Sequence, residues 1–408
     1  MSLDFLTNIE FWKYLSIPLV AGFVGWSTNW VAIKLLFFPI EPIGKPPWLG
    51  WQGILPSKAE KMGAITVDTT LSKLGSLSEV FKSMSPEVIA EHMAADISPR
   101  VEDYIDWIML EESPNFWKSL PEMAKRIVYT TARQNLPEAI HKIMNDIGDR
   151  VETMVDLKQL VIKQLVEEKR LVNRIFLECG AAEFRFIIIS GLYLGFAFGI
   201  IQMIVWLFFP QWWILPLCGI IVGYATNWIA LRIIFQPLHP IKIGPYTIQG
   251  LFLKRQRDVA AVWCDIVAKE IITLRNIIAN MLHGKKSENT HKVIRFHMRE
   301  VVEQTLGVAR PMVRFAVGNE EFEEIENAAS EKAIIVTASA FDDPDFNRER
   351  ARLVKELMED RMIKLSPEEF QYLLRPAFQE EEIKLILLGA FLGLLAGIGQ
   401  LVFVFGNV

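Results

Sequence analysis

The sequence predicts an all-α integral membrane protein with four transmembrane helices and two cytoplasmic helical regions, built from two parallel internal repeats. Composition is the first observation behind this prediction. The chain is 51% hydrophobic yet 22% charged, which indicates apolar spans that alternate with soluble blocks rather than one uniform globule. The second observation is a stretch that occurs twice, and such a repeat constrains the architecture before any single element is considered.

The repeated stretch reads GWSTNWVAIKLLFFPIEPIG at residues 25–44 and GYATNWIALRIIFQPLHPIKI at residues 223–243. The offset between the copies is 198 residues, since 223 − 25 = 198. A second pair of segments, GLYLGFAFGIIQ at 191–202 and GAFLGLLAGIGQ at 389–400, has the same offset (389 − 191 = 198). Two unrelated motifs that share one offset predict a tandem duplication.

Residues 1–38 are predicted to form an interfacial segment followed by transmembrane helix 1. Apolar residues at helical spacing within residues 1–13 favour a short helix at the membrane surface. Residues 14–38 form the first span, whose apolar part covers about 28 Å, close to the hydrocarbon thickness of a bilayer. The N-terminus lacks a basic region and a small-residue cleavage site, so no cleaved signal peptide is predicted.

Residues 39–182 are predicted to form the first cytoplasmic helical region, preceded by a membrane-surface loop. Proline removes a backbone donor and clashes with the preceding turn, so the first span ends at a group of four prolines: Pro39, Pro42, Pro46 and Pro47. Trp48 and Trp51 favour a position at headgroup level for the loop. A shallow re-entrant loop over residues 46–56 remains the open alternative.

Helical patterns dominate both soluble regions. Apolar residues recur at spacings of three and four in the stripe Leu136, Ile140, Ile143, Ile147, Val151 and Met154. The sequence leaves open whether this stripe packs within its own region or against another chain. Serine followed by proline or glutamate predicts helix starts at Ser85, Ser98 and Ser366.

The rest of the chain is predicted as a transmembrane hairpin at residues 183–236, a second cytoplasmic helical region at 237–382, and transmembrane helix 4 with the C-terminus at 383–408. The three spans in this part are expected at residues 187–209, 214–235 and 385–405. Aromatic residues around Pro210 suit the membrane–water interface at the turn of the hairpin. Spans two and three are therefore joined by a very short connection.

Four spans in this order place both soluble regions on one side of the membrane. Basic residues near the spans on that side are Lys34, Lys45, Lys58, Lys61, Arg185, Arg232, Lys242, Lys254, Arg255, Arg257 and Lys384. The opposite side carries Lys13. The positive-inside rule therefore predicts a bacterial inner membrane protein with cytoplasmic soluble regions and both termini facing outward. Because the two halves share one orientation, the repeats are parallel rather than inverted.

The chain resembles the bacterial domain-of-unknown-function 445 family of membrane proteins. The resemblance rests on Thr-Asn-Trp, the lysine five residues after the asparagine, the terminating proline and the downstream QGILPSKAEKMG. It covers most of the chain, with the unit doubled. The second copy departs from the pattern because the segment 249–252 lacks the proline that follows Leu55 in the first. The resemblance implies architecture and location, and the family name implies no activity.

The asparagines of the repeated stretch, Asn29 and Asn227, are the first candidate intramembrane polar sites, together with Thr28 and Thr226. An amide in hydrocarbon has two donors and an acceptor to satisfy. One interpretation is structural, with hydrogen bonds between helices. The other places the two amides around a path for a polar solute. Small residues beside them, Gly25 and Gly223 included, favour close packing.

Gln202 and Gln400 are the second pair of candidate polar sites. Each follows three glycines on the same helical face, and small residues at this spacing let two backbones approach closely: Gly191, Gly195 and Gly199, then Gly389, Gly393 and Gly397. We predict these glycines as helix-packing residues. The glutamines either support that packing or mark a second depth of a pathway.

Basic residues at the cytoplasmic helix ends are candidate contacts for anionic lipid headgroups: Lys34, Arg232, Lys45, Lys58 and Lys242. Topology alone also explains a basic residue at such an end. Besides the lipid bilayer and anionic lipids, the candidate partners are a second copy of the chain and a cytoplasmic protein.

Catalytic and cofactor motifs find little support in the sequence. The six histidines lack metal-ligand spacing, and no Walker loop, G-x-S-x-G or kinase signature occurs. The three cysteines share neither disulfide nor metal spacing. A net charge of −5 argues against nucleic acid as a partner. We therefore predict no catalytic residue, metal or cofactor.

The function expected from the sequence is the non-enzymatic handling or passage of a small solute or lipid at the interface between the repeats. A membrane-anchored scaffold, whose cytoplasmic helical regions bind protein partners, is the alternative. A lipid-modifying enzyme is the third and weakest hypothesis, for want of a catalytic constellation.

Overall fold

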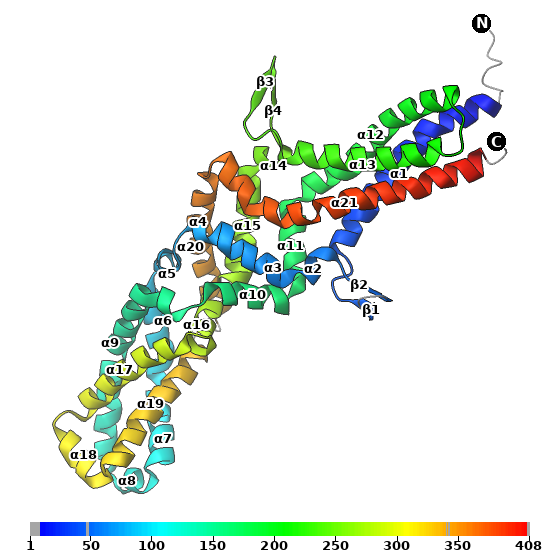
Figure 1. Ribbon diagram of the computed structural model, residues 1–408. Helices are drawn as coiled ribbons and strands as arrows, with labels where there is room; N and C mark the ends of the chain where they lie inside the picture. Colours follow the sequence, from blue (N-terminus) through cyan, green and yellow to red (C-terminus); the bar gives the residue numbers. More distant parts are fainter. Residues whose placement is uncertain (1–8, 46–48, 340, 342, 406–408) are drawn as a thin grey trace. The chain divides into compact units, whose positions relative to one another are not determined.

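The computed structural model describes residues 9–45, 49–339, 341 and 343–405, and these are almost entirely helical (Figure 1). Parts of three predictions lie outside the described residues: residues 1–8 of the interfacial segment, residues 46–48 of the surface loop, and the side chain of Lys45. The chain forms two compact units. Unit 1 comprises Met1–Leu71, Ile162–Trp263 and Arg361–Val408, and unit 2 comprises Ser72–Val161 and Cys264–Asp360.

These units divide the chain at other positions than the boundaries expected from the sequence. Parts of both expected soluble regions, at residues 39–71 and 162–182 and at 237–263 and 361–382, belong to the unit that holds the apolar helices. The rest of both regions, from the first and second half of the chain, forms a single compact unit.

The elements of unit 1 are α1 (Ile9–Phe37), β1 (Ile43–Lys45), β2 (Leu49–Trp51), α2 (Ile54–Ser57), α3 (Ala59–Ile65), η2 (Thr66–Leu71), α11 (Lys169–Cys179), α12 (Ala181–Phe208), α13 (Ile214–Phe235), β3 (Ile241–Ile243), β4 (Tyr246–Ile248), α14 (Leu251–Lys254) and α21 (Pro367–Val404). Three further helices straddle the unit boundaries: α10 (Leu157–Glu167), α15 (Gln256–Ile266) and α20 (Pro344–Ile363).

The four predicted spans are confirmed as four helices that are long and apolar enough to cross a membrane. They are Trp12–Phe37, Ala181–Phe208, Ile214–Phe235 and Glu382–Val404. The third has the bounds expected from the sequence. The second begins six residues earlier than predicted, because the helix continues back through Ala181 to Phe186 to a cap at Gly180. The fourth is the C-terminal part of the long helix α21.

The four apolar helices form two close pairs within one bundle. Helix α1 packs along α12, and α13 packs along α21, while α12 contacts α13 and α1 contacts α21. Figure 1 shows the four helices running side by side. We call the end where α12 turns into α13 the hairpin end, and the end where α1 and α13 stop before Pro39 and Pro237 the proline end.

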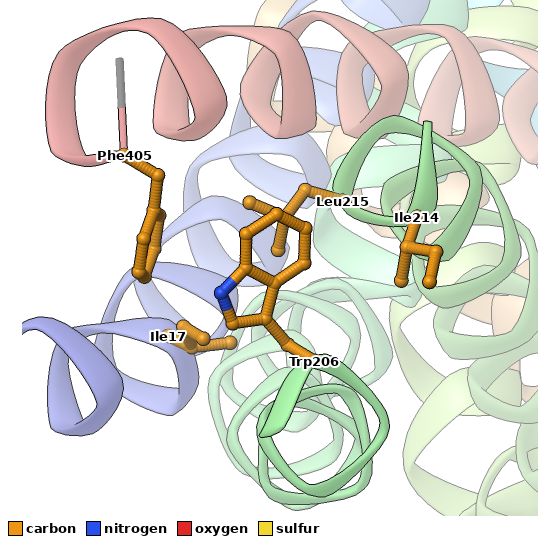
Figure 2. Close-up of a cluster of buried hydrophobic side chains, with 5 residues drawn as sticks. All are labelled: Ile17, Trp206, Ile214, Leu215 and Phe405. Atoms are coloured by element: carbon orange, nitrogen blue, oxygen red, sulfur yellow. The ribbon is translucent and has the colours of Figure 1, made fainter. Parts of the chain in front are cut away.

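A cluster of buried apolar side chains fills the hairpin end of the bundle. Ile17 of α1, Trp206 of α12 and Leu215 of α13 meet Phe405, which directly follows α21 (Figure 2). The rings of Trp206 and Phe405 lie 5.1 Å apart between centroids in a tilted arrangement. Each helix of the bundle contributes to this cluster, so it closes the core at the hairpin end.

Two short β-hairpins follow α1 and α13, and the sequence did not predict them. Strand β1 pairs antiparallel with β2, and β3 with β4. Three-residue strands are too short for a period-2 pattern to stand out from a loop. The turn of the second hairpin begins at Gly244, whose φ of 59° favours glycine, and glycine at the first turn position is a hairpin signal.

Unit 2 is built from α4 (Ser72–Leu74), α5 (Leu77–Ser83), α6 (Pro86–Ile97), η3 (Ser98–Arg100), α7 (Val101–Glu112), α8 (Pro114–Ser119), α9 (Glu122–Met154), η4 (Val267–Ile271), α16 (Leu274–His283), α17 (Ser287–Leu306), η5 (Gly307–Ala309), α18 (Arg310–Val317) and α19 (Asn319–Ser339). The apolar stripe of α9 packs inside this unit, where Ile140, Ile147, Val151 and Met154 are buried. The helix packs against α5 and α6 of its own expected region and also against α17 of the other, so its partners are not confined to the region expected from the sequence.

The predicted helix starts have mixed outcomes. Ser366 forms the expected capping box with Glu369 at the start of α21. Ser85 does precede α6, but its backbone is left-handed (φ 59°) and its side chain makes no capping hydrogen bond. Ser98 opens a 3₁₀ turn that joins α6 to α7, so the predicted cap there is wrong, because the backbone stays helical through Ser98.

Candidate functional site

Glycines bring the backbones of each helix pair into direct contact. A Cβ atom added to Gly25 would meet the carbonyl oxygen of Gly191, and one added to Gly223 would meet that of Gly389. The other predicted packing glycines lie in the same two interfaces: Gly195 and Gly199 against α1, and Gly393 and Gly397 against α13. Close approach of this kind strengthens van der Waals packing between helices where no hydrophobic driving force exists.

One helical turn after Gly25 and Gly223, an asparagine joins the two helices of each pair by a hydrogen bond. Asn29 donates from Nδ2 to the carbonyl oxygen of Ile187 at 2.7 Å, and Asn227 donates to that of Leu385 at 2.9 Å. Both bonds join residues 158 positions apart. The Oδ1 atom of Asn29 is buried and accepts no hydrogen bond from the described residues. One asparagine therefore combines a packing role with a free acceptor.

Asn29 and Asn227 line one pocket at the proline end of the bundle, which we call the proline-end pocket. Its empty volume is about 770 Å³, including space open to the surroundings. Apart from the two amides and Glu183, its walls are apolar or small side chains from α1, α11, α12, α13, α14 and α21: Ala32, Ile33, Leu36, Ile175, Phe176, Cys179, Phe184, Ile187, Leu231, Ile234, Phe235, Phe252 and Leu385. Such walls suit an apolar ligand.

The buried carboxylate of Glu183 lines the pocket and is paired with Arg255, which is not a lining residue. Glu183 is 4% exposed, and Arg255 donates from Nη1 to both of its carboxylate oxygens at 2.9 and 2.7 Å. The pair joins α12 to the turn after α14, because Arg255 directly follows Lys254. Burial of a carboxylate is costly unless it is paired in this way. Beside it, burial raises the pKa of the Cys179 thiol to about 12, so this thiol stays protonated at neutral pH.

The glutamines lie nearer the hairpin end than the asparagines do, and they line a second, smaller pocket. Gln202, Gln400 and Thr28 line about 370 Å³ of empty space together with glycines of α13 and α21. The Nε2 atom of Gln400 is buried and finds no acceptor among the described residues. The two depths expected from the sequence thus correspond to two pockets, with the asparagines around one and the glutamines around the other.

The threonines beside the asparagines form hydrogen bonds within their own helices. Thr28 donates to the carbonyl oxygen of Gly25 at 3.2 Å, and Thr226 to that of Gly223 at 3.3 Å. Both side chains are buried. Each hydroxyl proton is therefore used within its own helix, which limits what these residues offer to a ligand.

The basic candidates lie outside the pocket. Lys34 and Arg232 are exposed and sit over the rings of Trp30 and Trp228, with centroid distances of 5.9 and 5.0 Å. Lys242 is exposed in β3, and Lys58 is half-buried between α2 and α3. These positions leave Lys34, Arg232 and Lys242 accessible to anionic groups.

The ion pair of Glu183 and Arg255 and the apolar wall of Phe252 and Phe176 were not singled out from the sequence. Glu183 carried one signal, because it is an acidic residue directly before an apolar run. Its partner lies 72 residues away, and no local pattern points to it. In the sequence, Phe176 and Phe252 cannot be told apart from ordinary buried core residues.

A buried histidine in unit 2 was also missed. The ring nitrogens of His297 face Oδ2 of Asp146 at 2.9 Å and Oε2 of Glu300 at 3.1 Å, which ties α17 to α9. Among the described residues, no group of three or more His, Cys, Asp and Glu side chains is arranged to hold a metal ion. The arrangement serves as a structural clamp between two helices.

Comparison with known proteins gives relatives at low identity. The chain is 34% identical over 80 residues to a UPF0754 membrane protein of Shouchella clausii, covering 19% of this chain and 20% of that protein. It is 24% identical over 172 residues to one of Thermosynechococcus vestitus (40% and 38% of the chains) and 27% over 139 residues to one of Trichodesmium erythraeum (33% and 32%). The matches thus span well under half the length of these relatives.

No family model and no solved structure matches the chain. The names of these relatives describe a membrane protein and no activity. Together with the four apolar helices, these likenesses identify a multi-pass bacterial membrane protein whose relatives form an uncharacterised family.

Proposed function

We propose that the protein holds the acyl chain of a membrane lipid in the proline-end pocket, and so handles lipid without catalysing a reaction. One observation carries this proposal: an apolar pocket of about 770 Å³ opens among six elements around both asparagines. Among the described residues that line it, the Cys179 thiol stays protonated and the Glu183 carboxylate is held by Arg255, so the proposal assigns neither of them a catalytic role.

A lipid fits this site better than a polar solute does. A path for a polar solute needs hydrogen-bonding groups along its length, whereas the pocket walls are mainly aliphatic and aromatic. At the hairpin end, the cluster of Ile17, Trp206 and Leu215 fills the core. Between these two regions lie the glycine contacts and the smaller pocket of Gln202 and Gln400, which shares no lining residue with the proline-end pocket. The site therefore has the properties of a blind apolar pocket.

Two polar features can orient an amphiphile in the pocket. The free Oδ1 acceptor of Asn29 suits a hydroxyl donor of a glycerol or headgroup. The carboxylate of Glu183 is the second polar group of the lining, and its partner Arg255 places a positive charge directly behind it. Outside the pocket, Lys34, Arg232 and Lys242 add positive charge that favours anionic lipids.

The proposal includes a tandem duplication as the origin of the pocket. The asparagine bonds, the glycine contacts and the threonine bonds each recur with a shift of 198 residues in both partners. Outside the spans, Asn173 donates to the carbonyl oxygen of Phe37 and Gln371 to that of Phe235, with the same shift. These recurrences support two copies of one unit, related to the domain-of-unknown-function 445 family, whose interface is the pocket.

The orientation in the membrane is part of the same proposal. Basic residues near the proline end support a cytoplasmic position for that end in the bacterial inner membrane, with both termini facing outward. In this orientation the pocket takes lipid at the level of the inner leaflet.

Counting bound lipids tests the proposal. Ala32 is buried in α1 and lines the pocket, so Ala32→Phe fills part of it. Ala197→Phe is the matched control, because Ala197 is exposed on α12. Native mass spectrometry of the detergent-extracted full chain should show at least one phospholipid fewer on Ala32→Phe than on the wild type or the control.

Equal lipid counts on all three folded proteins would overturn the proposal. If Ala32→Phe does not fold, Ile33→Trp at the half-buried margin of the same pocket replaces it. The same loss of lipid is expected there.

A further inference from the structure

Unit 2 contains two adjoining apolar pockets that the spans do not explain. Their empty volumes are about 1,060 and 1,280 Å³, including space open to the surroundings. They share six lining residues from α7, α9, α17 and α19, namely Ile105, Ile108, Ala132, Met298, Val301 and Ala329. We call the two pockets together the unit 2 chamber. Figure 1 shows these four helices side by side.

Part of the chamber is apolar-walled space that the described side chains leave unfilled. Interiors are close-packed, with few voids larger than a water molecule. An unfilled cavity destabilises a fold in proportion to its volume. Water is a poor filling here, because a buried water needs several polar partners and the walls are almost entirely Ile, Leu, Val, Met, Ala and aromatic side chains. The chamber therefore suits a long apolar ligand.

Polar atoms in the walls indicate that the ligand also carries a polar group. Thr290 lines the chamber, is 1% exposed, and its Oγ1 has no hydrogen-bond partner among the described residues. Oγ1 of Thr305, in the other pocket, is likewise buried without a partner. A buried hydroxyl left without a hydrogen-bond partner destabilises the fold. A ligand oxygen beside either hydroxyl would remove that cost.

Helix α18 and the turn before it cover the chamber and expose an apolar face. Ala309 and Val313 line the chamber. Their neighbours point outward, since Val308 is 99%, Met312 75% and Phe315 92% exposed. Exposed side chains of this size on a soluble surface mark an interaction site.

Arginines flank the exposed face. The guanidinium groups of Arg310 and Arg314 lie over the ring of Phe322, a chamber residue, with centroid distances of 6.0 and 5.8 Å. Apolar residues next to basic ones on a short helix are typical of segments that lie in the interface of an anionic bilayer. Arg310 is paired with Glu303 at 2.6 Å, whereas Arg314 donates to the neutral amide of Asn319, so Arg314 supplies the positive charge that complements an anionic phospholipid surface.

We propose that unit 2 takes an acyl chain of an anionic bilayer phospholipid into the chamber, with α18 as the segment that contacts the bilayer surface. This site is separate from the proline-end pocket and goes beyond the function proposed for it. Together the two sites would give one chain two places for lipid, one in each unit.

Photo-crosslinking of the full chain tests this inference. The probe is phosphatidylglycerol with a diazirine at the end of an acyl chain, in vesicles that hold the reconstituted protein. After irradiation and proteolysis, mass spectrometry should find adducts on chamber peptides that contain Met298 and Ala329. Ala329→Phe, which fills the chamber, should lower these adducts about tenfold. Ala95→Phe, at an exposed alanine of α6, should leave them unchanged.

Further outcomes separate the parts of the proposal. Phe315→Asp lies on the exposed face and does not disturb the core, so it should lower chamber labelling from vesicles while labelling of the proline-end pocket persists. Unchanged labelling would overturn the role of α18. Labelling by dispersed diazirine palmitate but not by the phospholipid would overturn the bilayer source. A folded wild-type protein with unlabelled chamber peptides would overturn the site while leaving the proline-end pocket untouched.

Discussion

The side-chain amide of Asn29 donates a 2.7 Å hydrogen bond to the backbone carbonyl oxygen of Ile187, and this bond fastens α1 to α12 at the edge of an apolar pocket. Asn227 makes the same bond to Leu385 between α13 and α21. The two bonds hold the walls of the proline-end pocket at a fixed spacing. The two asparagines thus join neighbouring helices, and Asn29 retains an unused acceptor.

Replacing Asn29 with leucine removes one of these joints. Leucine keeps a similar bulk and suits a helix in lipid, so the loss should be close to that of one interhelical hydrogen bond, about 0.6–2 kcal/mol. Asn227→Leu should cost a similar amount, because its bond is equivalent. Unfolding of the purified chain in bicelles measures the free energy. A control is Ser27→Ala, whose hydroxyl bonds within its own helix. If the asparagine variants lose no more unfolding free energy than Ser27→Ala does, the asparagine bonds do not stabilise the helix pairs.

Replacing Gly25 with alanine should separate α1 from α12. The added Cβ would meet the backbone of Gly191, which cannot move aside as a side chain can. Overpacking of this kind costs about 1–3 kcal/mol. The same unfolding measurement on Gly399→Ala is the matched control, because a Cβ at Gly399 meets nothing within 4 Å. Two variants of equal stability would argue against glycine-mediated contact.

Removing Arg255 leaves the buried carboxylate of Glu183 without its partner. Breaking a buried ion pair from one side typically destabilises by about 3–5 kcal/mol. Arg255→Met should therefore lower the thermal unfolding temperature strongly. The double variant Glu183→Leu with Arg255→Met should recover much of the loss, since no charge is then left buried. A double variant as unstable as the single one would show that the pair acts through something other than charge.

The pH dependence of unit 2 should include a contribution from Asp265. Burial raises its pKa, but hydrogen bonds from Lys269 and Lys355 at 2.8 and 2.9 Å outweigh burial, so the net pKa is lowered. A lowered folded pKa gives stability that is present above the unfolded value of about 3.9 and is lost as the pH falls through the folded value.

Asp265→Asn should therefore be less stable than the wild type at pH 7, and the difference should shrink below about pH 4. Thermal unfolding of both proteins across this range measures it. Asp149→Asn is the control, because Asp149 is 73% exposed and its ion pair with Lys82 is worth little. A difference that stays constant with pH would contradict the assignment.

Much of unit 1 follows from the sequence because its signals are local. The bounds of α13 come from an apolar run that ends before Pro237, and the glycine faces of α12 and α21 come from spacings of three and four residues. Asn29 and Asn227, singled out by the repeat offset, both line the proline-end pocket.

The parts that sequence reasoning missed depend on contacts between distant residues. Arg255 reaches Glu183 across 72 positions, and the unit 2 chamber forms because α7, α9, α17 and α19 from both halves of the chain share one unit. Apolar periodicity predicts that a helix has a buried face, but it does not reveal whether the faces fill the space between them. The hairpins at Ile43–Lys45 and Ile241–Ile243 are too short to leave a pattern.

The central claim, a lipid chain in the proline-end pocket, is tested most directly by a density map of the full chain in nanodiscs of bacterial lipid. The account predicts elongated density that runs along Phe176 and Phe252 and ends near Asn29. A map in which side chains close the pocket, or in which the pocket holds only isolated water peaks, would show that no lipid chain binds there.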